Sequence, residues 1–507
     1  MAKKWYESAY RRNVIDMHIP DWDESFLSEF DPKAYVEMLV RSEVQSAVVY
    51  ADSCVGLCYY PTKAGAVHRG MKGRNFFLEL LEECHRHGIK VVAYFGLIFD
   101  NWAHEYHPDW RIIDARGRVA DPPHKGKIAP RFKICCPNSP YREYIVAIAE
   151  EIASGFEIDG FRFDMTFWPT SCYCRHCLKR FAEEVGGEPP RVINWLNPKW
   201  VAFQRKREEW LVEFAALATA AVKRVKPDIS VEHQASTYIQ SWRSGVSYAM
   251  ARHNDFLQGD FYGDKLQGCF ARKLFYNLSE NLPFGFETSF CIDIRDHTAK
   301  KSKDLLEAKA FASMTDGGAF VFIDGIDPVG TLNPAVYDRM GEIFQKTKPY
   351  ENFMGGTLCQ DVGVFFSTES KFDFEDSGRA VDDLEAVVSL PHVESCLNVC
   401  QAMIDHHIPF GVITKRNLAD LHRHKVILLP NVLMMDREEV EAIRRYVKSG
   451  GRIYASKYTS LVTKEGDLLK DFMLADVFGV NYRGETKEIF TYIAPAGGHE
   501  SLWRDYT

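Results

Sequence analysis

The sequence contains no long hydrophobic run. No apolar stretch approaches the roughly 20 residues that a membrane-spanning helix needs, and the first residues, MAKKWYESAYRRNVIDMHIP, lack the apolar core of a secretory leader. Positive charge is not in excess either, because the formal net charge is −8, which argues against non-specific nucleic-acid binding. We therefore expect no membrane partner, no nucleic-acid partner and a cytoplasmic location.

The chain also lacks internal repeats, low-complexity segments and a glycine-rich phosphate loop. The segment after the first β-rich run reads DMHIPDWDESF, which does not match the dinucleotide-binding fingerprint, so we expect no organic cofactor. The 13 cysteines are an odd number without the spacing of a disulfide framework. In a reducing compartment, clustered cysteines bind metal more often than they form disulfides.

Short β-rich runs alternate with amphipathic helical stretches over residues 1–350. This alternation favours an α/β fold, a (β/α)₈ TIM barrel, over a doubly wound sheet. The eight predicted strands are Asn13–Ile19, Ser46–Asp52, Lys90–Asp100, Asp159–Phe167, Ile229–Gln234, Asp255–Gly263, Pro283–Phe290 and Gly318–Gly325.

Residues 351–507 have a different pattern of apolar runs and helical stretches. The runs DVGVFFS, PFGVIT and KVILLP alternate with helical patterns such as REEVEAIRRYVKSGG, which predicts a smaller, flavodoxin-like α/β domain with no catalytic set of its own. The last residues, APAGGHESLWRDYT, form no closing element. We therefore expect this second domain to be incomplete at its C-terminus.

Polar residues gather at the carboxyl ends of the predicted barrel strands, where barrel active sites lie. A single carboxylate at such a position is usually a helix cap or half of a loop ion pair, but a set on several strands indicates a functional rim. The set consists of Asp16, His18, Asp100, Asp164, Glu232, His233, Asp260, Glu287 and Asp324.

Three cysteines follow the fourth predicted strand in the spacing C-x-C-x₂-C. Cys172, Cys174 and Cys177 lie within one tight turn, and a tetrahedral Zn²⁺ would need a fourth ligand. Cys135 or Cys136 in KICCPNSPYREY would approach the same loop in a barrel, and we choose Cys136. Four thiolates leave no open position, so the sequence predicts a structural zinc site. The alternative is a set of metal-free thiols in a loop.

The segments CYCRHCLKRFAEEV and CPNSPYREY resemble the zinc-cluster signature of family 42 β-galactosidases. The motifs VIDMHIPDWDESF, HPDWR, IDGFRFDM, SVEHQAS, GDFYGDK and GGAFVFIDGIDPVGTL are similar to the hypothetical glycosyl hydrolase 6 barrel, which occurs in family 151 α-L-fucosidases. The part from Asp361 onward resembles the β-galactosidase trimerisation domain. The resemblance implies a retaining glycoside hydrolase that acts on α-L-fucosides, and it suggests a homotrimer.

Two departures refine this resemblance. Family 42 has an Asn-Glu pair at the end of the fourth strand, whereas this chain reads RFDMTF with Asp164 at the matching place. That difference moves the interpretation from β-galactosidases towards fucosidases, whose fourth strand ends in a nucleophilic Asp. The resemblance also leads us to expect a histidine near Cys54, where ADSCVG has none.

Retaining hydrolysis needs two carboxyl groups about 5–5.5 Å apart, one ionised and one protonated. We predict that Asp164 is the nucleophile, kept ionised by Arg162, which shares its strand face. For the acid/base we favour Glu232, with His233 beside it. Glu287 is the alternative, and Asp260 is a third candidate.

Hydroxyl groups of a sugar are bound by carboxylates and imidazoles, and its ring by aromatic side chains. We expect substrate contacts from the set Asp16, His18, His68, Trp102, Arg162, His233 and Asp260. The substrate would be a small oligosaccharide or glycoside. The competing hypotheses are a β-galactosidase or another exo-glycosidase on the same fold, and a catalytically inactive carbohydrate-binding protein.

Overall fold

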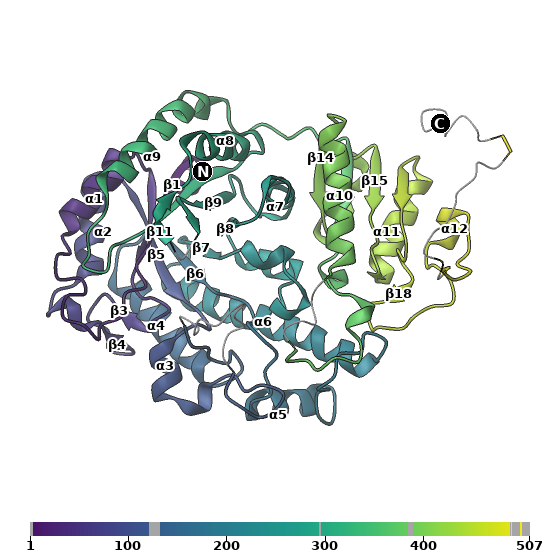
Figure 1. The fold of residues 1–507 in the computed structure, drawn as a ribbon, viewed down its shortest axis with the longest axis horizontal. Helices are drawn as coiled ribbons and strands as arrows, with labels where there is room; N and C mark the ends of the chain where they lie inside the picture. The colour runs from purple at the N-terminus through teal and green to yellow at the C-terminus, as the bar shows by residue number, and fades with distance from the viewer. Residues whose placement is uncertain are drawn as a thin grey trace.

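The computed structural model describes residues 4–120, 132–293, 296–383, 389–486, 488 and 497–498. Figure 1 shows two units side by side, a barrel formed by the N-terminal two thirds and a smaller sheet unit towards the C-terminus. No helix in these ranges combines the length and the apolarity needed to cross a lipid bilayer.

The barrel is an eight-stranded parallel sheet, as the alternating pattern predicted. Its strand order is β7-β6-β5-β2-β1-β12-β9-β8, so neighbouring strands follow the chain around the barrel. The strands are β1 (Arg11–Asp16), β2 (Ser46–Tyr50), β5 (Lys90–Gly96), β6 (Gly160–Asp164), β7 (Ser230–His233), β8 (Gln258–Asp260), β9 (Gly285–Ser289) and β12 (Ala319–Gly325).

The seam between β7 and β8 is closed without a regular ladder. Two backbone hydrogen bonds cross it, from the Asp255 amide to the Val231 carbonyl at 2.8 Å and from the Ala235 amide to the Gln258 carbonyl at 2.9 Å. Side chains fill the remaining places, because the Val231 amide donates to Asp255 Oδ2 at 2.7 Å and the His233 amide donates to Asn254 Oδ1. The barrel is therefore closed at β7–β8 by backbone and side-chain hydrogen bonds in equal number.

Helices on the outside of the barrel begin at side-chain caps. Asn75, Asp264 and Ser302 accept hydrogen bonds from the first turns of α2, α7 and α8, which satisfies amide groups that a helix start leaves unpaired. The helices of this unit are α1 (Pro32–Arg41), α2 (Phe76–Arg86), α3 (Asn101–Tyr106), α4 (Tyr141–Gly155), α5 (Arg175–Glu184), α6 (Pro198–Val225), α7 (Lys265–Leu278), α8 (Lys303–Thr315) and α9 (Pro334–Thr347).

Two small sheets lie in loops of this unit. They are the pair β3 (Leu57–Cys58) and β4 (Ala66–Val67), and the pair β10 (Cys291–Asp293) and β11 (Asp296–Lys300). Three of these strands have only two or three residues, too few for a detectable hydrophobic period, and sequence reasoning did not predict any of the four.

The second unit is a four-stranded parallel sheet in the order β14-β13-β15-β17, the start of the flavodoxin-like order 2-1-3-4-5. Its elements are β13 (Val362–Phe365), α10 (Pro391–Asp405), β14 (Phe410–Ile413), β15 (Val426–Leu429), β16 (Met434–Met435), α11 (Arg437–Lys448), β17 (Arg452–Ala455), β18 (Val462–Thr463) and α12 (Ala475–Phe478). The predicted fold class is confirmed for both units.

The two units pack through α7, which contacts both β14 and α10 (Figure 1). Asn277 of α7 donates to Gln360 Oε1 at 2.7 Å and to the Val412 carbonyl at 3.0 Å. A second contact involves the segment between α5 and α6, where the ring of Trp195 stacks on Phe372 at 4.0 Å between centroids. The barrel and the second unit are thus joined at two places, at α7 and at the segment between α5 and α6.

Candidate active site

A cavity of about 230 Å³ lies at the carboxyl ends of the barrel strands. It brings together six of the residues predicted from the sequence, contributed by β1, β6, β8 and β9 or the loops that follow: Asp16, His18, Arg162, Asp164, Asp260 and Glu287. Tyr50, Tyr94, Phe132, Met165, Phe167, Gln234 and Tyr262 also contribute to its walls. The cavity therefore combines several carboxyl groups with aromatic and apolar surface.

Asp164 is the last residue of β6 and is half-buried in this cavity. Its Oδ2 accepts a hydrogen bond from the Tyr94 hydroxyl at 2.6 Å, and its Oδ1 accepts one from the Met165 amide at 2.9 Å. Met165 has a positive φ of 55°, a left-handed conformation that costs free energy for a non-glycine residue and often occurs at functional sites. The two hydrogen bonds and this turn fix the direction of the carboxyl group.

Arg162 does not form its strongest contact with Asp164, contrary to our expectation. Its two terminal nitrogens both donate to Glu287, to Oε1 from Nη1 and to Oε2 from Nη2 at 2.9 Å. Burial raises the pKa of Asp164, and the opposing charge of Arg162 lowers it only in part. Arg162 lies two residues below the strand end and reaches across the barrel interior to β9, which explains the difference.

Glu287 holds a proton more tightly than an ordinary glutamate. Burial raises its pKa to about 8, although the Arg162 charge acts in the opposite direction. The single positive charge of Arg162 faces Glu232 and Asp164 as well as Glu287, so it cannot stabilise all three carboxylates fully. Glu287, with its raised pKa, lines the same cavity as Asp164.

Glu232 lies deeper than the cavity wall. It is paired in register with Arg162 on the neighbouring strand, with Oε1 3.6 Å from Arg162 Nη1. Its Oε1 also accepts a hydrogen bond from Gln258 at 3.3 Å, and Gln258 in turn accepts one from Arg12 at 2.8 Å. Glu232 is fully buried in this network and does not line the cavity.

His233 and His68 also lie away from the cavity. The His233 ring contacts Thr166 Oγ1 at 3.0 Å and Thr219 Oγ1 at 2.9 Å, and burial lowers its pKa to about 3. Successive residues of a strand point to opposite faces, so Glu232 points inward and His233 outward. His68 is buried in the loop after β4, where its Nε2 lies 3.1 Å from the Pro20 carbonyl oxygen.

Tyrosines from β2 and β5 form one wall of the cavity, and sequence reasoning did not identify them. The rings of Tyr50 and Tyr94 stack at 3.8 Å between centroids, and the Tyr50 hydroxyl donates to Asp16 Oδ1 at 2.6 Å. His18 Nδ1 accepts a hydrogen bond from the Cys54 amide at 3.2 Å. The backbone at Cys54 thus orients His18 from the position where the resemblance led us to expect a histidine side chain.

Trp102 lines a neighbouring cavity of about 860 Å³. This second cavity shares His18 and Phe132 with the first, so the two are adjoining. The remaining side chains of its wall come from the loops after β1, β2 and β5, with Trp22 and Tyr106 among them.

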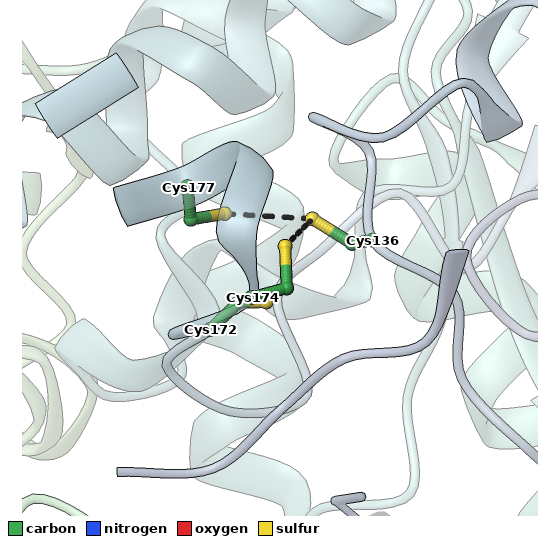
Figure 2. Close-up of side chains that lie close together, drawn as sticks. All are labelled: Cys136, Cys172, Cys174 and Cys177. Carbon is green, nitrogen blue, oxygen red and sulfur yellow. Dashed lines mark hydrogen bonds between the residues drawn. The ribbon is translucent and has the colours of Figure 1, made fainter. Parts of the chain in front are cut away.

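The four predicted metal ligands lie together in the loop after β6 and in the segment before α4. All four Sγ atoms of Cys136, Cys172, Cys174 and Cys177 are within 4.8 Å of one another, and Figure 2 shows Cys136 facing the other three. The sulfur of Cys136 lies 3.4 Å from that of Cys177 and 3.6 Å from that of Cys174. A Zn–S distance of 2.3 Å in a tetrahedron requires sulfurs about 3.8 Å apart.

The surroundings of the cluster also fit a zinc ion. Asn138 donates to two of the sulfurs, from its amide to Cys136 at 3.4 Å and from Nδ2 to Cys177 at 3.3 Å, and such donors stabilise thiolates. Cys135 points elsewhere, towards the Asp100 carbonyl. His176 does not join the cluster, because its Nε2 lies 3.1 Å from Asp109 Oδ2. A metal ion held by these four thiolates would have no open coordination position, as in structural zinc sites.

Comparisons with known proteins match both units. The model of "Hypothetical glycosyl hydrolase 6" matches residues 31–165, and that of the "Beta-galactosidase trimerisation domain" matches residues 360–489. The first match lies within the barrel, and the second covers most of the second unit.

Individual relatives of this chain are distant. The β-galactosidase bgaB of Geobacillus kaustophilus is 21% identical over 306 residues, which are 54% of this chain and 43% of that protein. The α-L-fucosidase isoenzyme 2 of Paenibacillus thiaminolyticus aligns with a TM-score of 0.71 at 19% identity, over 92% of this chain and 66% of that chain. The β-galactosidase of Bacillus circulans sp. alkalophilus aligns with a TM-score of 0.72 at 16% identity, over 93% and 75%. The chain thus spans less than half of the curated relative, and the structural likeness establishes the fold.

Proposed function

We propose that this protein is a retaining, exo-acting glycoside hydrolase, and specifically an α-L-fucosidase. The observation that carries the proposal is that Asp164 and Glu287 line one cavity, the first held by hydrogen-bond donors and the second with a pKa that burial raises to about 8. Two carboxyl groups in different protonation states are what retaining hydrolysis requires.

In the proposed reaction the Asp164 carboxylate attacks the anomeric carbon while the glycosidic C–O bond breaks. Glu287 gives its proton to the departing oxygen, and the sugar becomes an ester of Asp164. A water molecule then attacks the same carbon and loses its proton to Glu287, which releases the sugar and restores both groups. Arg162 is a positioning residue here, because its paired hydrogen bonds fix the orientation of Glu287.

The size and lining of the cavity support a terminal sugar of the fucose type. Its volume of about 230 Å³ is below the roughly 300–1,000 Å³ of pockets for drug-sized ligands, which suits one pyranose ring. Met165, Phe167 and Phe132 supply apolar surface beside the carboxyl groups, suitable for the methyl group of a 6-deoxy sugar. A β-galactosidase is the second candidate, favoured by the relatives of that name.

We also propose a structural Zn²⁺ on the four cysteines and a homotrimer assembled through the second unit. The sulfur distances and the Asn138 hydrogen bonds support the metal, and the match to a trimerisation domain supports the oligomer. Light scattering of the purified chain tests the trimer, since a monomer would contradict it.

A panel of nitrophenyl glycosides tests the function. We expect cleavage of the α-L-fucoside, with kcat reduced about 10³-fold or more in Asp164→Asn and partly restored by azide. Asp228→Asn, at a fully exposed carboxylate, is the control. A 2-fluoro-fucosyl fluoride should label Asp164 in mass spectrometry. Cleavage of the galactoside alone would favour the second candidate, and no cleavage of any glycoside would refute the hydrolase proposal.

A further inference from the structure

We infer that the leaving group of the substrate is a neutral oligosaccharide, whose sugar rings stack on aromatic side chains in the cavity beside the proposed catalytic one. This inference rests on the proposed function and goes beyond it, because it names what is attached to the terminal sugar. The cavity concerned, called the aromatic cavity below, is the one that contains Trp22, Trp102 and Tyr106.

The aromatic cavity adjoins the catalytic cavity and is much larger. His18 and Phe132 belong to the walls of both, so the two cavities meet at these side chains, and a substrate longer than one sugar would extend past them into the larger cavity. Its volume is about 860 Å³, against about 230 Å³ for the catalytic cavity. The volume of the aromatic cavity is more than three times that of the catalytic cavity. It therefore has room for several sugar rings beyond the one that is cleaved.

Large aromatic rings line this cavity and remain exposed to solvent. Trp22 is 73% exposed and Tyr106 is 66% exposed, and the ring of Trp102 lies 5.7 Å from that of Tyr106 at 34° between planes. Grouped exposed aromatic surface in soluble proteins marks binding sites. The flat faces of pyranose rings carry C–H groups that pack on such rings, while their hydroxyl groups stay in water.

The charged groups of the cavity, Arg69, Asp21 and Glu105, disfavour an anionic ligand. Arg69 and Asp21 neutralise each other, with Arg69 Nε 3.1 Å from Asp21 Oδ2 and Arg69 Nη2 donating to the Asp21 carbonyl at 2.7 Å. Because this guanidinium is already paired, it offers little attraction to sulfate or carboxylate groups on a sugar. The carboxyl groups of the adjoining catalytic cavity would repel such anions further.

The loop that carries Trp22 is held in place before any ligand binds. His68 contacts the Pro20 carbonyl, Arg69 binds Asp21, and the Trp22 ring packs edge-on against Phe26 at 4.8 Å between centroids. Ordering costs on binding are small when the binding surface is already fixed. His68, predicted as a substrate contact, therefore serves as a positioning residue for this loop.

The inference is tested by varying the leaving group at a constant terminal sugar. The probes are the glycosyl fluoride of the sugar that the nitrophenyl panel selects, α-L-fucosyl or β-D-galactosyl fluoride, and neutral di-, tri- and tetrasaccharides that end in that sugar. We expect kcat/KM relative to the fluoride to rise from di- to tetrasaccharide. Trp22→Ala and Trp102→Ala should each lower the tetrasaccharide-to-fluoride ratio about three- to tenfold, the effect of one stacking contact.

Phe353→Ala is the matched control, because this ring is 83% exposed and lies outside the aromatic cavity. The inference is overturned if the ratio of kcat/KM for the oligosaccharide to that for the fluoride does not depend on chain length. It is also overturned if this ratio is unchanged in both tryptophan variants. Because the fluoride is still cleaved in these cases, the proposed function would stand. If no fluoride is cleaved, binding of the tetrasaccharide is measured by calorimetric titration instead. Binding that is weaker in Trp22→Ala supports the inference, and the absence of binding overturns it. A changed oligomeric state of Trp22→Ala would assign the surface to contacts between copies and also overturn it.

Discussion

The proposed acid/base, Glu287, makes a quantitative prediction about pH. Because burial raises its pKa to about 8, the proton that the leaving oxygen needs is present below pH 8 and is lost above it. We expect kcat/KM to fall about tenfold for each pH unit above 8. At the acid end, activity should fall as Asp164 becomes protonated, at a higher pH than for an ordinary aspartate, since burial raises its pKa.

The assay compares two aryl glycosides of the selected sugar from pH 5 to pH 10. A 4-methylphenyl leaving group needs protonation, whereas a 2,4-dinitrophenyl group does not. We expect the fall in kcat/KM above pH 8, called the basic limb below, with the first substrate only. In Glu287→Gln the limb should disappear, and kcat should fall about 10²–10⁴-fold for the methylphenyl glycoside but far less for the dinitrophenyl one.

Asp260→Asn is the discriminating comparison, because Asp260 also lines the catalytic cavity. The reasoning is refuted if the basic limb persists in Glu287→Gln, or if it disappears in Asp260→Asn instead. Trapping of the sugar on Glu287 rather than on Asp164 would reverse the two roles.

Two further predictions concern stability. Cys174→Ser should lower the bound zinc, measured by atomic absorption, and lower the melting temperature, whereas Cys135→Ser, a buried thiol outside the cluster, should leave the zinc content unchanged; equal zinc in both variants would contradict the metal site. Lys464→Met should lower the free energy of unfolding by about 3–5 kcal/mol in denaturant titrations, because Lys464 Nζ lies 3.3 Å from buried Glu369 and 3.2 Å from buried Glu439, which would lose their common cation. A change below about 1 kcal/mol, typical of an exposed ion pair, would contradict this account.

Local sequence patterns were sufficient for the framework of the molecule. The eight barrel strands were found because each is a short apolar run and helical stretches lie between most of them, and the cysteine cluster because three of its thiols lie within six residues. The same locality explains why two of the predicted site residues do not line the cavity. Glu232 and His233 were expected at the substrate together, yet neighbouring residues of a strand face opposite sides, and the structure puts one in the barrel interior and the other behind the wall.

Contacts across the barrel could not be predicted from local patterns. Arg162 and Glu287 are 125 positions apart and lie on strands that are not neighbours in the sheet, so only the closed barrel brings them together. Tyr50 and Tyr94 were missed for a different reason. An aromatic residue inside an apolar strand has the pattern of a core residue, and its hydroxyl is recognised as functional only when the partner is known.

The unusual closure of the barrel has a consequence for how the cavity can adapt. Between β7 and β8 two of the four hydrogen bonds described above are accepted by the Asn254 and Asp255 side chains, which can lengthen or exchange with water more readily than a continuous ladder. Gln234 and Asp260 lie on either side of this seam, and Gln234 Nε2 donates a hydrogen bond to Asp260 Oδ1 across it. We expect the cavity wall to move at this seam when a bulkier sugar binds. An inhibitor that orders the seam should slow deuterium uptake at the Ala235 amide.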